Sequence, residues 1–340
     1  MVKLLKLLLA YKFKEPKPSQ TKGGFTLIEL LVGLVLALLV ILPLLGFMVN
    51  ILSSDRQEQA KANSAQEIQT ALDYIARDVE QAIYIYDAHG LSKIQASLPT
   101  PANSVPVLVF WKRQFVPNVI PTAQGNDDAF VYALVAYYVR TLPTAECTKP
   151  TSTVSCTAQI TRTLIKNVAK DRSNEPIDND ERAQGSPGFV MFDPKVSSSV
   201  EEIMNAWPPT GTDIDRVAGN IQDNTPEVLI DYIDQTAVTG DPKLCPSIQR
   251  STVPPGIADA SAYDTANYQQ VPKPTSTIGF FACVDVEKTS AQIFMRGNAL
   301  ARLRPKSNPP TYVESQAAYF PRASIQVKGR GLVTVKQGEE

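Results

Sequence analysis

The sequence predicts an α+β protein in which one long N-terminal helix packs on an antiparallel β-sheet head with large loops. Residues 30–54 form an uncharged, largely apolar run, and an apolar repeat at helical spacing follows it. The rest of the chain alternates strand-like runs with long polar stretches. With 340 residues, of which 44% are hydrophobic, the chain suits one membrane helix followed by one globular head.

The apolar run is long enough to cross a membrane. As a helix, residues 30–49 span about 30 Å, which is the thickness of a hydrocarbon core. A secretory signal has a shorter apolar region, with a small-residue cleavage site after it. Here the small residues Gly23 and Gly24 come before the run. A cut beside them leaves the helix on the mature protein.

Charge is unevenly distributed along the chain. Residues 1–24 carry six lysines and one glutamate, a net charge of +5, and because the whole chain carries −1 the remainder carries −6. Lys and Arg residues that flank an apolar helix stay on the cytoplasmic side. We therefore expect a single-pass protein of the inner (plasma) membrane, with its N-terminus in the cytoplasm and an acidic head outside.

The most specific motif lies at the start of the apolar run. It reads Lys22, Gly23, Gly24, Phe25, Thr26, Leu27, Ile28, Glu29, Leu30, Leu31, Val32. This string resembles the type III signal peptide of type IV pilins and pseudopilins. The resemblance implies a pilin-like fold, a leader at residues 1–24, and a prepilin peptidase that cuts after Gly24 and methylates the new amino terminus at Phe25.

Glu29 is a lone carboxylate at the start of an apolar helix. Such a charge costs roughly 2.5–3.5 kcal/mol if it reaches the bilayer centre, so it needs a partner. In the family that the motif resembles, the matching glutamate is thought to pair with the N-terminal amine of a neighbouring subunit. The resemblance thus makes Glu29 an assembly residue, and the expected partners are other pilin or pseudopilin subunits and an inner-membrane assembly platform.

Helical periodicity continues beyond the membrane run. Apolar residues recur at steps of three and four, at Ala65, Ile68, Leu72, Ile75, Val79, Ala82, Ile83 and Tyr86. We expect one helix from Phe25 to about Tyr86, with a membrane half at residues 25–52 and an amphipathic half at residues 53–87. Core packing is favoured over a coiled coil, because the repeat covers only about three heptads.

The membrane half contains two residues that weaken a helix. Pro43 removes a backbone hydrogen bond, and Gly46 costs about 1 kcal/mol relative to Ala. We expect a kink or a locally melted turn at residues 39–46. The alternative is a proline that the helix tolerates.

A second resemblance covers the end of the predicted helix. It rests on Ala71, Leu72, Asp73, Tyr74, Ile75, Ala76, Arg77, Asp78, Val79, Glu80, Gln81 and Ala82. This stretch is similar to the corresponding helix of J-type pseudopilins and W-type minor pilins, which implies a large accessory subunit. A type IV pilus, a type II secretion pseudopilus and a hormogonium polysaccharide secretion apparatus all stay open as the machine.

Residues 88–340 are predicted to form an extracytoplasmic β-rich head. Runs rich in Val, Ile, Tyr and Phe predict strands at residues 106–115, 129–142, 158–168, 227–236, 277–286, 291–302 and 324–328. Hairpins are expected at residues 131–168 and 278–302. Large loops are expected at residues 169–188, 205–226 and 239–275.

The four cysteines suggest two local disulfides. In an oxidising compartment the favoured pairs are Cys147 with Cys156, at the tip of the first hairpin, and Cys245 with Cys283. Four cysteines allow three connectivities, and free buried thiols are a further alternative.

The sequence contains no enzyme signature of the Gly-x-Ser-x-Gly, P-loop, dinucleotide-binding or His-Glu-x-x-His type. Its one histidine, His89, is expected in a turn at the end of the long helix, because a single histidine without a ligand cluster does not make a zinc site. We expect no enzymatic activity and no cofactor.

Two charged regions are weaker binding candidates. In the acidic stretch at residues 171–181, Asp178 and Asp180 are the candidate calcium ligands, although the EF-hand spacing is absent and a solvated loop is favoured. Basic residues gather near the C-terminus, at Arg296, Arg302, Arg304, Lys306, Lys328 and Arg330. Scattered surface charge is the favoured interpretation, and nucleic acid is not an expected partner.

The sequence therefore predicts a minor pilin or pseudopilin, assembled through its N-terminal helix into a filament, and placed near the tip because the head is large. The alternative is a membrane-anchored extracytoplasmic binding protein whose Gly-Phe-Thr-Leu-Ile-Glu string is never processed. Exchange of Glu29 for Ala separates the two, since only a pilin should fail to assemble.

Overall fold

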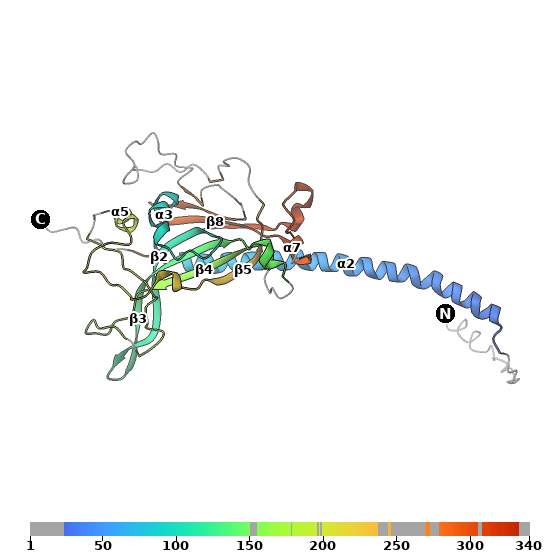
Figure 1. Ribbon diagram of the computed structural model, residues 1–340, viewed down its shortest axis with the longest axis horizontal. Coiled ribbons are helices and arrows are strands. Elements are labelled where there is room, and N and C mark those ends of the chain that lie inside the picture. The colour runs from blue at the N-terminus through green and yellow to red at the C-terminus, as the bar shows by residue number, and fades with distance from the viewer. Residues whose placement is uncertain are drawn as a thin grey trace, which may run out of the picture. The chain divides into compact units, whose positions relative to one another are not determined.

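The structure is a computed structural model that divides into two units (Figure 1). The first unit ends at Ser54 and the second, the head, begins at Asp55. The structure describes residues 24–149, 155–177, 179–195, 197, 199–236, 244–245, 269–272, 279–304 and 308–332. The α+β class is confirmed, because a long N-terminal helix and antiparallel sheets make up the chain.

Helix α2 (Leu27–Val79) is the long helix that the sequence predicts. It is helical at every residue from 39 to 46, so the predicted melted turn is wrong and Pro43 is tolerated within the helix. The helix also ends at Val79, earlier than the predicted end near Tyr86. Strand β1 (Ala82–Ile85) takes the next residues, and all four of them are buried. A short strand that is buried on both faces is apolar at every position. Its residues therefore also fit the apolar positions of a helical repeat, and the repeat was extended into β1 by mistake.

A short helix follows β1. Helix α3 (Ala88–Ile94) contains His89, which is buried, and Asp87 caps it by accepting a hydrogen bond of 2.8 Å from the Gly90 amide. The prediction that His89 lies in a turn at the end of the long helix is therefore wrong.

The first sheet is five-stranded and antiparallel, in the order β1-β2-β3-β4-β5. Its remaining strands are β2 (Ser104–Thr122), β3 (Gly125–Arg140), β4 (Ala158–Lys166) and β5 (Glu227–Ile233). Strand β5 ends three residues before the predicted end at residue 236. Asp234, which follows it, pairs instead with Arg296 (Asp234 Oδ2 to Arg296 Nε, 2.6 Å).

Strands β2 and β3 form a longer hairpin than the sequence predicts. The predicted strand ends at residue 115, but β2 continues through Pro117 and Pro121, and a register shift between Val116 and Ile120 accommodates the first of these prolines. Strand β1 stops opposite Lys112, and β4 stops opposite Ala133. Residues 113–132 therefore form a two-stranded ribbon beyond the rest of the sheet, visible at the β3 label in Figure 1.

The second sheet is four-stranded and antiparallel, in the order β6-β7-β8-β9. Its strands are β6 (Gln270–Val271), β7 (Phe280–Asp285), β8 (Ser290–Arg296) and β9 (Arg322–Lys328). The predicted strand at residues 291–302 is partly wrong, because helix α7 (Ala299–Leu303) replaces its end. Asn298 causes the change: its side chain accepts a hydrogen bond of 3.1 Å from the Ala301 amide and so caps the new helix.

Short helices complete the described part of the chain. They are α4 (Thr144–Cys147), α5 (Val200–Asn205), η1 (Gln95–Ser97), η2 (Ile221–Asp223) and η4 (Glu314–Tyr319). Of the three predicted loops, residues 205–226 are described throughout. Apart from the last residue of α5, an isolated bridge at Arg216 and η2, their backbone is irregular. Most of the predicted loop at residues 239–275 lies outside the described residues.

One hydrophobic core joins the helix to both sheets. Leu72 and Ile75 of α2, Trp111 of β2 and Ile293 of β8 belong to the same buried cluster. Trp111 lies at its centre and contacts the rings of Phe189, Phe192 and Trp207 edge-on, with centroids 5.2–6.0 Å apart. The second half of α2 is thus part of the head, as its apolar stripe predicts.

Candidate processing and assembly segment

Residues 24–26, directly before α2, are exposed and non-helical. Gly24, Phe25 and Thr26 precede the helix, and the Phe25 side chain is 83% exposed. A Cβ atom added at Gly24 would meet no other atom within 4 Å. The Gly24–Phe25 bond therefore lies where a protease can reach an extended chain.

Thr26 and Glu29 together form the first turn of α2. The Thr26 hydroxyl accepts a hydrogen bond of 3.3 Å from the Glu29 amide, which is the contact of a helix N-cap. Thr and Glu at this spacing form the capping-box pair, and a carboxylate in the first turn also favours the helix dipole. The sequence analysis missed this capping role, although the Thr-x-x-Glu spacing was the signal for it. Glu29 is exposed, so its carboxylate is accessible to a partner.

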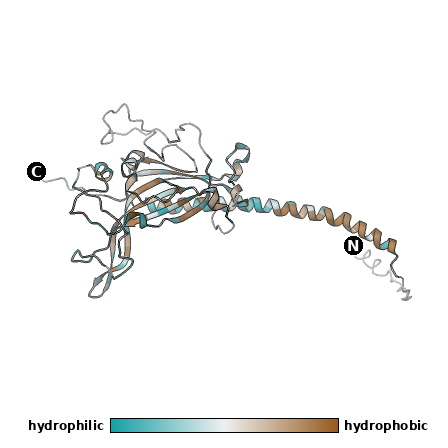
Figure 2. Ribbon diagram, in the orientation of Figure 1, coloured by the Kyte–Doolittle hydropathy of each residue, from teal (hydrophilic) through white to brown (hydrophobic). Residues whose placement is uncertain are grey.

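Among the described residues, none covers the first part of α2. Every residue from Gly24 to Leu52 is exposed, among them some twenty large apolar side chains (Figure 2). In the described part of the chain, α2 is the one helix that is long and apolar enough to cross a membrane. Apolar surface of this extent is unstable in water, so lipid or neighbouring helices must cover it.

A comparison with protein families identifies this segment. The model described as the prokaryotic N-terminal methylation motif matches residues 20–45. The chain thus carries the N-terminal segment that is typical of type IV pilin-like proteins. The match includes Gly24, Phe25 and Glu29 and implies processing by a prepilin peptidase and assembly with other pilin subunits. No curated protein and no solved structure matches the chain.

The head of this pilin-like protein contains two disulfides. Cys147 bonds to Cys156 and Cys245 bonds to Cys283, with Cα atoms 5.1 and 5.6 Å apart. These are the two pairs that the sequence favours. Disulfides persist in oxidising compartments, which agrees with a head outside the cytoplasm.

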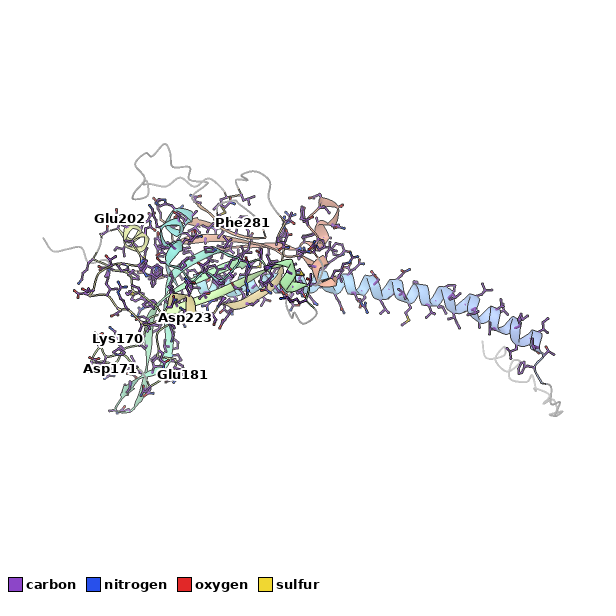
Figure 3. All side chains as sticks on the ribbon, in the orientation of Figure 1. Lys170, Asp171, Glu181, Glu202, Asp223 and Phe281 are labelled. Carbon is purple, nitrogen blue, oxygen red and sulfur yellow. A yellow bond between two sulfur atoms is a disulfide. The ribbon has the colours of Figure 1, made fainter. Side chains whose placement is uncertain are left out.

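The weak calcium candidate stays a prediction. Asp178 lies outside the described residues, and Asp180 is bound to Arg182 through its backbone amide at 2.9 Å and through Nη2 at 2.6 Å. Within the ranges described, no three or more His, Cys, Asp or Glu side chains are grouped as a metal site. The acidic stretch, with Asp171 and Glu181 labelled in Figure 3, packs along the β2–β3 ribbon through Arg172, which lies 3.0 Å from Asp127.

Two of the basic residues near the C-terminus are internal contacts. Arg296 forms a buried ion pair with Asp234. Arg302 donates a hydrogen bond of 2.8 Å to Ser64 and pairs with Glu67, so it attaches α7 to α2. The interpretation of these two as scattered surface charge is wrong. Lys306 lies outside the described residues.

A buried ionic cluster around Asp78 of α2 was not predicted from the sequence. The Asp78 carboxylate lies 2.6 Å from Lys112 Nζ and 2.8 Å from Arg162 Nε, and it accepts a hydrogen bond of 2.8 Å from the Tyr137 hydroxyl. Burial alone would raise the pKa of Asp78, but the hydrogen bond and charge of Arg162, and those of Lys112, outweigh it and hold that pKa below its ordinary value. The available signal was position: Asp78 follows Ile75 by three residues and so lies on the buried stripe.

Proposed function

We propose that this protein is a minor pilin or pseudopilin that assembles through α2 into a filament. Before assembly it lies in the inner membrane with its N-terminus in the cytoplasm and its head outside. The observation that carries the proposal is the coincidence of the methylation motif with the exposed apolar first part of α2. This apolar surface must be covered by lipid or by neighbouring helices, and a filament subunit uses both.

Assembly exchanges one cover for another. In the membrane, lipid surrounds the apolar part of α2, and in the filament the same side chains pack against helices of neighbouring subunits. An assembly platform in the inner membrane is the expected partner for this exchange. The function is structural, and it uses binding surfaces in place of catalytic groups.

Glu29 and the amine of Phe25 set the register of assembly. Cleavage after Gly24 creates a positive amine beside an exposed carboxylate that is held in the first turn of α2. A carboxylate and an amine of two neighbouring subunits neutralise each other in a low-dielectric surrounding, where each alone is costly. The capping bond of Thr26 fixes the helix start and so fixes where the carboxylate lies.

The size of the head supports an accessory position. Two sheets and their loops share one core with α2, and a head of this size is difficult to repeat around a narrow shaft. A place near the filament tip follows. Among the machines, a type IV pilus, a type II secretion pseudopilus and a polysaccharide secretion apparatus each suit such a subunit.

The first test is the mass of the N-terminal peptide from membrane and sheared-filament fractions of the native cell. We expect a peptide that begins at N-methylated Phe25. An intact leader that still contains Lys22 and Gly24 would refute the assembly mechanism and leave a membrane-anchored head.

The second test is the exchange Glu29→Ala, with Glu58→Ala as the matched control. Glu58 is also an exposed carboxylate on α2, but it pairs with Lys61 of its own helix at 2.8 Å. We expect Glu29→Ala protein to be processed, to remain in the membrane and to be missing from filaments, while the control assembles. Equal incorporation of both variants would contradict the role of Glu29.

A further inference from the structure

A cleft opens in the head where the end of α2 meets the first sheet. It measures about 650 Å³ and lies between α2, strands β2 and β4, and Arg182, which directly follows the acidic stretch. All of its lining belongs to the head unit. A cleft of this volume is in the range that binds a small ligand or a few side chains of a partner.

The lining of the cleft is strongly basic. Among the described residues it includes Arg77, Lys112, Arg162, Lys166 and Arg182 but only one carboxylate, Asp78. Lys112 and Arg162 share that single carboxylate. Arg182 is balanced by Asp180. The cleft thus holds three positive charges without a counter-charge.

The structural roles of these residues explain only part of this charge. Arg77 lies in the last turn of α2, where a cation favours the helix dipole, and Arg162 ties β4 to the helix through its Nε. Arg162 makes no hydrogen bond through its two terminal nitrogens to any described residue. Lys166 donates to the carbonyl oxygen of Arg182, a neutral acceptor, and burial lowers its pKa. Arg77 has no ion-pair partner among the described residues.

Aromatic side chains line the same cleft. Tyr74 of α2 and Phe115 of the β2–β3 ribbon are 45% and 44% exposed, although large aromatic residues gain most when they are buried. The Phe115 ring contacts that of Phe130 at a tilt of 52°, with centroids 5.2 Å apart, which extends the apolar surface along the ribbon. Exposed aromatic rings beside Arg residues are the composition of a protein-binding surface.

We propose that this cleft binds an acidic polypeptide segment of a neighbouring subunit. Its Asp or Glu carboxylates pair with Arg77, Lys166 and the terminal nitrogens of Arg162, and its apolar atoms pack on Tyr74 and Phe115. The occupant follows from charge complementarity, because the excess positive charge of the lining attracts carboxylates. The chain after Gly24 itself carries a net charge of −6, so this basic cleft is a local exception on its surface. This inference rests on the proposed function, because assembly is what brings a neighbouring subunit to the head.

The test measures binding of fluorescent poly-L-glutamate to the full mature chain in detergent. The informative variant is Arg77→Glu with Lys166→Glu. The control, Lys93→Glu with Lys195→Glu, makes the same change in net charge at two exposed lysines that do not line the cleft. We expect at least a tenfold loss of affinity in the cleft variant, an effect within about threefold in the control, and weaker binding as NaCl is added.

Three results would overturn the proposal. The first is no binding of poly-L-glutamate at low salt, and the second is an equal loss of affinity in both variants. The third is tighter binding of polygalacturonate, which carries carboxylates on sugars and would assign the cleft to an acidic polysaccharide. The mass of the N-terminal peptide tests the proposed function separately. Methylated Phe25 in a protein whose cleft does not bind poly-L-glutamate rejects only this inference. Unprocessed Phe25 in a protein that binds poly-L-glutamate normally rejects only assembly.

Discussion

The carboxylate of Asp78 lies 2.6 Å from the ammonium group of Lys112 inside the head, one residue before α2 ends. Both side chains are buried, with 7% and 5% exposed. Arg162 of β4 and Tyr137 of β3 bind the same carboxylate, so one side chain attaches the helix to three strands. Within the head, this cluster therefore fixes the end of α2 to the first sheet.

The exchange Asp78→Asn should destabilise the head by about 3–5 kcal/mol, because it leaves the buried Lys112 and the partly buried Arg162 without their counter-charge. Urea unfolding of the full chain in detergent measures this loss, followed by the fluorescence of the buried Trp111 and Trp207. Asp73→Asn is the matched control: Asp73 lies on the same helix, is exposed, and among the described residues binds only Gln69, at 3.1 Å. A loss of less than 1 kcal/mol, similar to that expected of the control, would show that the cluster does not hold the helix.

The same cluster predicts how stability depends on pH. The folded state holds the pKa of Asp78 below its ordinary value of 3.8, so its contribution is complete above that pH and is lost as the pH falls through the lower, folded value. We expect the difference in unfolding free energy between the wild type and Asp78→Asn to be constant from pH 7 to about pH 5 and to shrink below about pH 4. Urea titrations at several pH values test this. If the difference in unfolding free energy grew in acid, the pKa of Asp78 would have to be raised in the folded state.

The parts of the fold that the sequence predicts are those with a local cause. An uncharged run too long for a soluble helix predicts the membrane half of α2, and runs of β-branched and aromatic residues predict the centres of β2, β3, β4 and β7. The errors lie where distant residues decide. The helix ends at Val79 because Ala82 can enter a sheet beside Lys112, thirty residues later in the chain. Nothing in the residues near Val79 specifies that pairing.

The candidate sites show the same division. Gly24, Phe25 and Glu29 are consecutive parts of a short motif, so sequence alone identifies them. The basic cleft draws residues from α2, β2, β4 and the stretch at Arg182, and its excess charge appears only when these are brought together. Arg302 was assigned to the surface for the same reason, because its contacts at Ser64 and Glu67 are more than two hundred residues away.

The two disulfides should contribute unequally to stability. Cys245 and Cys283 are 38 residues apart, and Cys147 and Cys156 are nine apart. A crosslink restricts the unfolded chain more when it closes a longer loop, which gives about 4 kcal/mol for the first pair and about 2.5 kcal/mol for the second. Double Cys→Ser variants of each pair, compared by urea unfolding, measure the order. Each variant is the other's control, and a larger loss at the shorter loop would reverse the prediction.

Substitution of Gly24 should block processing without disturbing the fold. The chain leaves open space around this residue, so Gly24→Val changes no internal contact, and a branched side chain beside the Gly24–Phe25 bond prevents the peptidase from closing on an extended backbone. We expect cleavage to slow by at least about tenfold, so that the leader remains on most of the protein.

Gly46→Val is the matched control for that substitution. Gly46 also has open space around its Cβ position, and it lies just outside the matched residues 20–45. Mass spectrometry of the N-terminal peptide measures processing, and the fluorescence of the buried tryptophans shows whether the head is folded. If Gly24→Val is cleaved as fast as the control, the peptidase does not recognise this glycine and the cut lies elsewhere. If both variants keep the leader, helix insertion and not the cleavage site is what the valine disturbs.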